Sequence, residues 1–183
     1  MKNLRLNYET LIKITRSLTK SRNTEEIIRM TVDSIKTALD VKGCTLFLIN
    51  QETRELEVAA STGLSREYLN KGAISALKSI AGSLQDGPVA VYDVGDDPRI
   101  QYPEAAKAEG IASILSVPIL IGDEAIGAVR VYTAKKWEFT LEDVNFVQAI
   151  AQIAGVIIEM TRLYQGQSEY IETLSTLSES PAL

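Results

Sequence analysis

The strongest constraint on the fold is a pair of apolar stretches, residues 114–121 and 125–133, on either side of the polar turn Gly122-Asp123-Glu124. Short apolar runs rich in β-branched residues around such a turn predict a β-hairpin with a three-residue loop. Pairing across that loop would place Ser116 opposite Arg130. We therefore expect a sheet built around this hairpin.

The two faces of the predicted hairpin differ in polarity, because side chains alternate between the faces of a strand. One face is wholly apolar and needs a cover of helices; it carries Leu115, Val117, Ile119, Ile121, Gly127, Val129 and Val131. The other face mixes polar with apolar groups; it carries Ser116, Pro118, Ala128, Arg130 and Tyr132. Such a mixture is typical of a ligand pocket, so a small-molecule site is expected on this face.

The rest of the chain predicts further helices and strands around this hairpin. Amphipathic spacing and capping residues indicate helices over 4–20, 23–40, 73–84 and 103–110. Runs of strand-forming residues predict strands over 44–49, 56–61 and 89–94. Asn23 and Glu26 have the spacing of a capping box at the start of the second helix.

A long C-terminal helix is predicted from Leu141, with Thr140 and Asp143 as its cap. Its continuity is left open at Gly166, because glycine costs about 1 kcal/mol inside a helix. One apolar stripe repeats in sevens: Phe146, Ala149, Ile153, Val156, Met160, Leu163, Gln167, Tyr170, Leu174 and Leu177. A second stripe is Val144, Val147, Ala151, Ala154 and Ile158. One stripe can pack on the sheet and the other on a partner helix, which predicts a coiled-coil role.

Composition favours a cytoplasmic protein. No run approaches the roughly 18 apolar residues of a membrane-spanning helix, and the N-terminus lacks the apolar stretch of a signal peptide. Cys44 is the only cysteine, which excludes an internal disulfide and fits a reducing compartment. The net charge of -5 would repel nucleic acid and anionic membrane surfaces, so neither is expected as a partner.

The sequence contains no histidine, the commonest general base and metal ligand and the usual haem ligand. No pair of nucleophile and base can be assembled from the remaining residues, so the chain is expected not to be an enzyme. The acidic run 93–97 lacks the spacing of a calcium-binding loop. No metal site is therefore predicted.

Three motifs resemble the GAF domain family and occur in the family's order: EGIASILSVPI (109–119), IGAVRVY (126–132) and WEFTLED (137–143). The resemblance spans roughly residues 11–164. It implies an α+β (α/β) fold with a central antiparallel sheet of about six strands. Terminal helices would pack on one face of the sheet, and a ligand pocket would lie under loops and short helices on the other. The expected organisation is a dimerisation helix (1–22), the GAF domain (23–164) and a helical extension or frayed tail (165–183).

Departures from the family's specialised patterns narrow the choice of ligand. Bilin-binding and haem-binding members use a histidine, which is absent, and Cys44 begins a predicted strand. Phe139 and Asp143 match the end of the cyclic-nucleotide signature, but Val144 replaces its glutamate and its asparagine-lysine pair is missing. Members that reduce free methionine sulfoxide use several cysteines, and one is not enough for thiol exchange. The ligand and any cofactor stay unidentified.

The mixed sheet face and its borders supply the expected ligand contacts: Ser116, Arg130, Tyr132, Ser61, Asp93 and Ser113. Residues 65–87 and 93–112 would form the roof. The Arg130 guanidinium is suited to a carboxylate or phosphate, which favours an anionic ligand. The alternative is an internal ion pair of Arg130 with Asp93 or Glu109.

Two functions are compatible with these expectations. In the first, a sensory domain binds a small molecule, and its last helix transmits the change to an output partner through a homodimer held by the first and last helices. In the second, the pocket is vestigial and the domain serves only dimerisation or docking. A collapsed pocket with a paired Arg130 would favour the second function.

Overall fold

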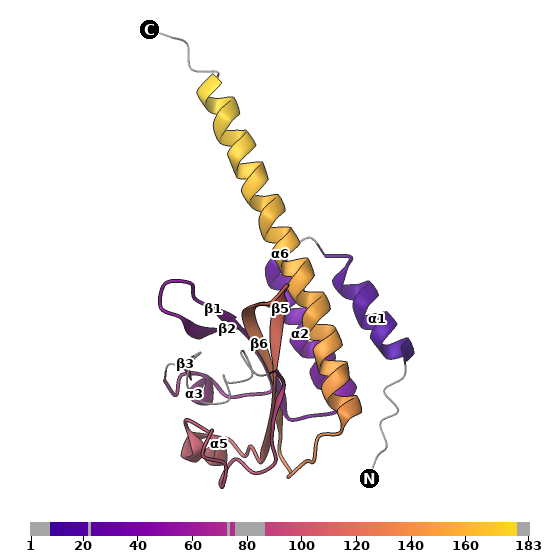
Figure 1. Ribbon diagram of the computed structural model, residues 1–183, viewed down its shortest axis with the longest axis vertical. Helices are drawn as coiled ribbons and strands as arrows, with labels where there is room; N and C mark the ends of the chain where they lie inside the picture. Colours follow the sequence, from indigo (N-terminus) through magenta and orange to yellow (C-terminus); the bar gives the residue numbers. More distant parts are fainter. Residues whose placement is uncertain (1–7, 22, 73, 76–86, 179–183) are drawn as a thin grey trace.

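The computed structural model describes residues 8–21, 23–72, 74–75 and 87–178, with the backbone alone at 165 and 168–178. An antiparallel six-stranded sheet with the order β3-β2-β1-β6-β5-β4 forms the centre of the fold. Long helices cover one face, and short helices with loops lie on the other (Figure 1). The predicted α+β architecture is confirmed.

The sheet consists of β1 (Gly43–Ile49), β2 (Glu55–Thr62), β3 (Ile74–Ser75), β4 (Val89–Val91), β5 (Ser113–Ile121) and β6 (Glu124–Thr133). The β1–β2 and β5–β6 hairpins join through pairing of β1 with β6. Arg130 therefore lies near the middle of the sheet, opposite Thr45 on one side and Ser116 on the other.

The β5–β6 hairpin has the predicted pairing of Ser116 with Arg130 but a different turn. Ile121 pairs with Glu124, so the loop holds two residues, 122–123, and the predicted three-residue loop is wrong. A β-bulge further along the hairpin adds one residue to β6 and restores the predicted register.

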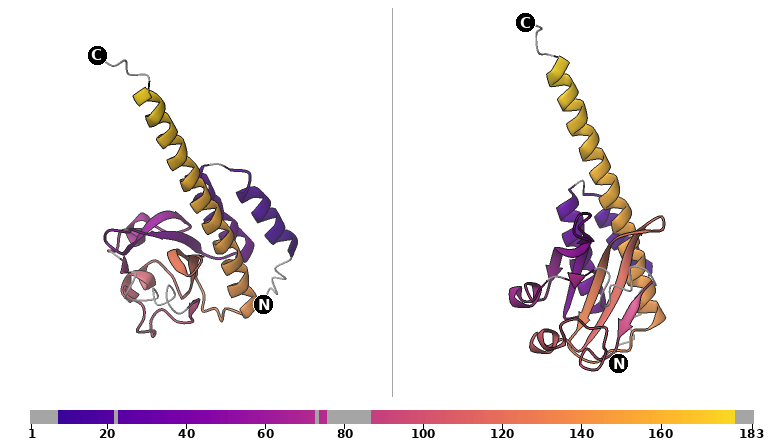
Figure 2. Two further views of the ribbon diagram at one scale, coloured as in Figure 1. Left: turned by 45° about the horizontal axis from the view of Figure 1, so that its top comes forward. Right: turned by 60° about the vertical axis from the view of Figure 1, so that its left-hand side comes forward.

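Of the three long helices, α2 (Thr24–Leu39) and α6 (Leu141–Ser178) cover the apolar face of the sheet, and α1 (Tyr8–Leu18) packs on α2 and α6 (Figure 2). The sequence predicted the first helix from residue 4, and residues 1–7 lie outside the described part of the chain. The core between the helices and the sheet includes Val32, Ile35, Leu115, Val117, Ile119, Val129, Val131, Val147, Ala151, Ala154 and Ile158. The helices thus bury the face that was expected to need them.

The start of α2 is only partly the predicted capping box. Asn23 Oδ1 accepts hydrogen bonds from the N–H groups of Glu25 and Glu26 at 2.9 and 3.2 Å. The Glu26 carboxylate accepts a hydrogen bond from the Ser21 hydroxyl at 2.6 Å, and the Asn23 N–H donates to that hydroxyl oxygen at 3.1 Å. Ser21 thus lies between the two expected partners, so the prediction was right for Asn23 and wrong for Glu26.

Helix α6 runs unbroken through Gly166 and extends well beyond the sheet (Figures 1 and 2). At its start, Asp143 Oδ2 accepts the Thr140 N–H at 2.9 Å, and the Asp143 N–H donates to Thr140 Oγ1 at 3.2 Å. By length and composition, Leu141–Tyr164 is a candidate membrane span. However, the stripe from Val147 to Ile158 is buried against the sheet, which is the packing of a core helix.

Two short helices, α3 (Arg66–Leu69) and α5 (Pro103–Ala108), lie on the opposite side of the sheet from α2 and α6 (Figure 1). The sequence predicted α5 from its proline but did not predict α3. Ser65 caps α3 by accepting the Tyr68 N–H at 3.1 Å. These helices place side chains over the mixed face of the sheet.

Two predicted elements between β2 and β5 differ in the structure. Residues 74–75 of the predicted helix 73–84 form β3, and its other residues lie outside the described part of the chain. Strand β4 ends at Val91 rather than at residue 94, because Asp93 accepts the Gly95 N–H at 2.9 Å and begins a turn.

Candidate functional site

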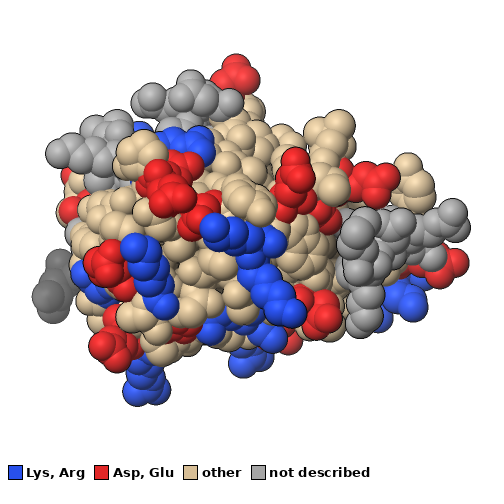
Figure 3. Space-filling model, turned by 90° about the horizontal axis from the view of Figure 1, so that it is seen from below, with Lys and Arg blue, Asp and Glu red and all other residues tan. Residues whose placement is uncertain are grey.

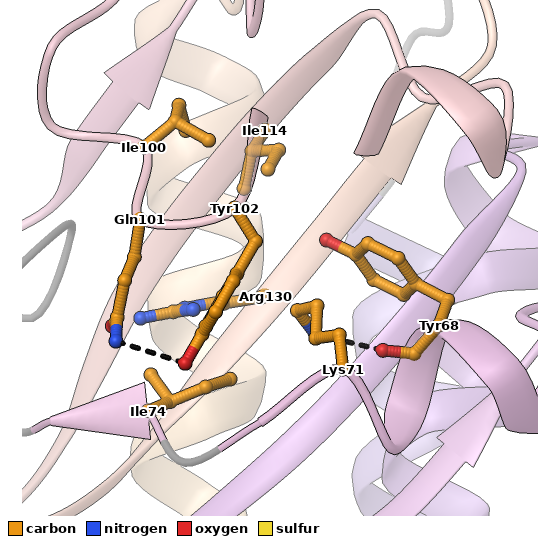
Figure 4. Close-up of a pocket in the computed structure, with 8 residues that line it drawn as sticks. All are labelled: Tyr68, Lys71, Ile74, Ile100, Gln101, Tyr102, Ile114 and Arg130. Carbon is orange, nitrogen blue, oxygen red and sulfur yellow. Dashed lines mark hydrogen bonds between the residues drawn. The ribbon is translucent and has the colours of Figure 1, made fainter. Parts of the chain in front are cut away.

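A small cavity lies on the mixed face of the sheet, between β6, the segment after α3 and the loop before α5 (Figure 4). Its volume of about 20 Å³ has room for about one water molecule, which needs roughly 10–15 Å³. The lining residues are Tyr68, Lys71, Ile74, Ile100, Gln101, Tyr102, Ile114 and Arg130. Among these described residues, two are cationic and none is acidic.

Arg130 is the most unusual group in the cavity. Only 5% of its surface is exposed, and among the described residues neither Nε nor Nη2 has a hydrogen-bond partner. The guanidinium carbon lies 5.2 Å from the centroid of the Phe47 ring, which is a weak compensation for lost hydration. The Tyr132 hydroxyl interacts with the guanidinium but carries no opposite charge. A buried charge without an ion-pair partner costs several kcal/mol, so this arrangement needs an explanation.

The two carboxylates proposed as internal partners of Arg130 are engaged elsewhere. Asp93 forms an ion pair with Lys136. Glu109 accepts the Ser65 N–H at 3.0 Å and lies 3.8 Å from Lys42 Nζ. Burial favours the protonated form of Glu109, but the hydrogen bonds from Ser65 and the charge of Lys42 outweigh it and lower the pKa of Glu109. The described residues therefore contain neither of the predicted ion pairs of Arg130.

Lys71 supplies the second cation of the cavity. Its Nζ donates a hydrogen bond to the Tyr68 carbonyl oxygen at 3.0 Å and lies 3.8 Å from the centroid of the Tyr68 ring. Burial and the charge of Arg130 lower the pKa of Lys71 to about 8, although Glu109 opposes this shift. Lys71 is thus a partly buried cation that loses its proton near pH 8.

The roof of the cavity is held by contact between two loops. The Tyr102 hydroxyl oxygen accepts a hydrogen bond from Gln101 Nε2 at 3.1 Å (Figure 4). A Cβ atom placed on Gly72 would lie 2.6 Å from this hydroxyl oxygen, and the φ of Gly72 is +136°. Glycine is needed here for both reasons, and it brings the segment after α3 close to the loop before α5.

Ser116 and Tyr132, two of the predicted contacts, are buried on the same sheet face but are not part of the cavity lining. Ser116 pairs with Arg130 across the strands. The Tyr132 ring packs edge-to-face against Tyr68, with 5.9 Å between the ring centroids. Burial raises the pKa of Tyr132 to about 12, so its hydroxyl stays protonated at neutral pH. Both residues thus lie beside Arg130 on this face without lining the cavity.

The other three predicted contacts lie away from the cavity. The Ser61 and Thr45 hydroxyl oxygens form a hydrogen bond at 2.8 Å between β2 and β1. Ser113 Oγ accepts the Trp137 N–H at 2.8 Å and so links β5 to the segment before α6. Asp93 lies in the turn after β4. Of the six predicted contacts, only Arg130 lines the cavity.

Sequence reasoning missed Lys71, Tyr68 and Tyr102 as site residues. All three come from the segments predicted as the roof, where no periodic pattern indicates which side chains point inward. One sequence feature could have indicated this segment: Ser65 is an N-cap residue, and it begins the short helix that precedes Lys71.

A helix-covered antiparallel sheet with a polar cavity under loops on its free face defines an α+β module of the kind that carries a small-molecule site. The family model for the GAF domain matches residues 21–159. The chain belongs to the GAF domain family, a family of sensory and regulatory domains, as the sequence motifs predicted. A search of the curated proteins found no match.

Solved structures with the same fold come from several bacteria. The GAF domain of a phosphoenolpyruvate-protein phosphotransferase from Coxiella burnetii has a TM-score of 0.79 at 20% identity, covering 90% of this chain and 99% of that one. The corresponding Acinetobacter domain has a TM-score of 0.74 at 18% identity, covering 89% and 97%. A free methionine-R-sulfoxide reductase from Neisseria meningitidis has a TM-score of 0.74 at 19% identity, covering 86% and 90%. At these identities the similarity establishes the shared fold.

Proposed function

We propose that this GAF domain is a sensory module that binds a small anionic molecule in the cavity at Arg130. The observation that carries the proposal is the guanidinium itself, which is 5% exposed and has two nitrogen atoms without a hydrogen-bond partner among the described residues. A carboxylate or phosphate group would supply the missing acceptors and the opposite charge.

The cavity is smaller than a metabolite, so ligand binding requires the roof to open. Lys71, Gln101 and Tyr102 belong to the short segments over the sheet rather than to its core (Figure 4). Loops over a rigid sheet are the elements that rearrange most readily around a ligand. The ligand is therefore expected to displace Gln101 and Tyr102 while Arg130 stays fixed on β6.

We propose a discrete small molecule rather than a polyanion as the ligand. The face of the molecule in Figure 3 carries lysine and arginine side chains beside aspartate and glutamate side chains. A nucleic acid would find no continuous basic surface on this face.

Transmission is proposed to pass through α6 in a homodimer. The α6 side chains Val156, Met160 and Leu163 are 44, 49 and 61% exposed, and they follow one another at steps of four and three residues. Such spacing forms a coiled-coil seam, and the sequence continues it at Tyr170, Leu174 and Leu177. A second copy of the chain supplies the same seam, so we propose that α6 pairs with its counterpart and α1 flanks the interface. The output partner would be reached through this pair of helices.

We also propose that the domain is not an enzyme, although one similar structure is a reductase. Cys44 is fully buried in β1, and burial raises the pKa of its thiol far above neutral pH. A protonated, buried thiol is a poor nucleophile. The proposal therefore assigns Cys44 to the core.

A second candidate, a dimerisation module with a vestigial pocket, is favoured by the small size of the cavity. A vestigial pocket was also expected to contain an ion pair of Arg130, and the described residues form no such pair. A functional site can have a small cavity before its ligand binds. A vestigial site, in contrast, gives no reason to keep a buried arginine without an ion pair, so we favour ligand binding.

Native mass spectrometry of the protein purified from its own host tests the proposal. We expect the wild type to carry a small anionic molecule and the Arg130→Met variant to lose it, with at least a tenfold weaker affinity once that molecule is identified. Arg99→Met is the matched control, because Arg99 lies outside the cavity and pairs with Asp97. Equal retention of the molecule by the wild type and Arg130→Met would favour the vestigial pocket.

A further inference from the structure

We infer that the cavity selects a ligand group with two negative charges, and that Lys71 and Arg130 hold this group together. The inference rests on the proposed function and adds the charge of the ligand and a second recognising residue. It also predicts that binding is coupled to the protonation of Lys71.

Geometry is the first support. Lys71 follows α3 and Arg130 belongs to β6, yet both side chains line the same cavity (Figure 4). Neither forms an ion pair with any described residue. Two like charges in a half-buried site repel each other unless an anion lies between them. The nearby Glu109 carboxylate is already offset by Lys42. One negative charge on the ligand would therefore leave a surplus positive charge in the cavity, whereas two would neutralise it.

The charged and titratable groups around Lys71 determine which group in the cavity changes its charge with pH. Arg130 faces it from β6, Tyr68 from α3, and Glu109 from the end of α5. The pKa of Glu109 is lowered, so this carboxylate stays ionised, and burial raises the pKa of Tyr68, so this phenol stays neutral. Among these described groups, Lys71 alone changes its charge between pH 7 and 10.

The coupling to pH follows from the position of Lys71. With its pKa near 8 in the free protein, Lys71 is only partly charged in mildly alkaline solution. A bound dianion favours the charged lysine, so binding takes up a proton there. Affinity for a dianion must then fall as the pH rises above about 8, by up to tenfold per pH unit. A single negative charge can be held by Arg130 alone and should depend less on pH.

Isothermal titration with sulfate and methanesulfonate tests the inference, because both anions keep their charge between pH 7 and 9.5. At constant ionic strength, we expect the wild type to bind sulfate more tightly than methanesulfonate and to lose sulfate affinity above pH 8. Lys71→Met should weaken sulfate binding at pH 7 at least tenfold and methanesulfonate binding less than about threefold. Lys71→Arg should retain sulfate binding but lose its pH dependence, and the exposed control Lys107→Met should behave as the wild type.

The outcomes separate the inference from the proposed function. If Lys71→Met binds sulfate as well as the wild type while Arg130→Met does not, the site has one recognising cation and the inference fails alone. If Lys71→Arg keeps the full pH dependence, the coupling to Lys71 is refuted. If neither anion binds the wild type at tens of millimolar, or if Arg130→Met changes nothing, the proposed anion site fails as well.

Discussion

Arg130 places a positive charge on a central strand of the sheet, where water and acidic side chains would normally be needed to hold it. Its neighbours across the strands, Thr45 and Ser116, are neutral, and Asp93 and Glu109 are engaged with other groups. Keeping such a group costs folding free energy, which is the usual cost of a preformed binding site.

Replacing Arg130 with methionine should therefore leave the free protein as stable as the wild type or stabilise it by up to about 2 kcal/mol. Methionine has a similar length and carries no charge that must be desolvated. Thermal unfolding in a buffer without multivalent anions measures the effect. A loss of more than about 1 kcal/mol would show that Arg130 holds the fold together and would weaken its assignment to a ligand.

Lys71 predicts a specific pH dependence of stability. Its pKa is near 8 in the folded protein and about 10.4 in an unfolded chain, so between these values the unfolded state binds the extra proton. The free energy of unfolding of the wild type, relative to Lys71→Met, should thus rise with pH across this window. Urea unfolding of both proteins at pH 7.5, 9 and 10 checks the sign. A constant or falling difference would mean that the pKa of Lys71 is not lowered.

At the scale of elements, the contact of α6 with β5 fixes the helix on the sheet. Gly155 lies at this contact, where an added Cβ would come within 2.5 Å of Cγ2 of the fully buried Ile119. Gly166 lies in the same helix but has no atom within 4 Å of such a Cβ. The two glycines thus differ in packing while sharing the same helical conformation.

Gly155→Ala should destabilise the domain by about 1–3 kcal/mol, because overpacking outweighs the better helix propensity of alanine. Gly166→Ala should be neutral or stabilise by up to about 1 kcal/mol for the propensity alone. Urea unfolding followed by circular dichroism compares the two variants. Equal changes in the free energy of unfolding for the two variants would show that Gly155 is not in close contact with Ile119 of β5.

The elements that sequence predicted well are those with a local pattern. The alternation of polarity in β5 and β6 predicted which side chains share a face of the sheet, since a strand's period is a property of the backbone. The capping pair Thr140 and Asp143 predicted the start of α6, because the hydrogen bonds of a helix cap join residues that are close in the sequence. Local order in the sequence was sufficient for both.

The walls of the cavity could not be predicted in this way. Lys71 lines the same cavity as Arg130 only because the segment after α3 folds over the sheet, and this arrangement depends on packing between residues distant in the sequence. Glu109 was a plausible partner for Arg130 by charge, yet the Ser65 backbone and Lys42 hold it. Nothing in a linear pattern distinguishes these competing partners.

At the scale of the whole molecule, the seam on α6 predicts a dimer. We expect sedimentation at tens of micromolar to show a dimer for the wild type and a monomer for Met160→Lys combined with Leu163→Lys. The monomer should keep the thermal unfolding of its sheet, because both side chains are exposed. Glu138→Lys, an exposed change outside the seam, is the control. A variant that unfolds would place the two residues in the core instead.

Binding of an anion at Arg130 is tested most directly by its own Nε–H group. A proton–nitrogen NMR spectrum of the wild type contains an arginine Nε–H signal that is missing from the spectrum of Arg130→Met, which assigns it. During a sulfate titration at pH 7, this signal should shift saturably, because the Nε–H gains a charged acceptor that the described residues do not provide. An unchanged Arg130 signal at saturating sulfate would contradict the proposed site.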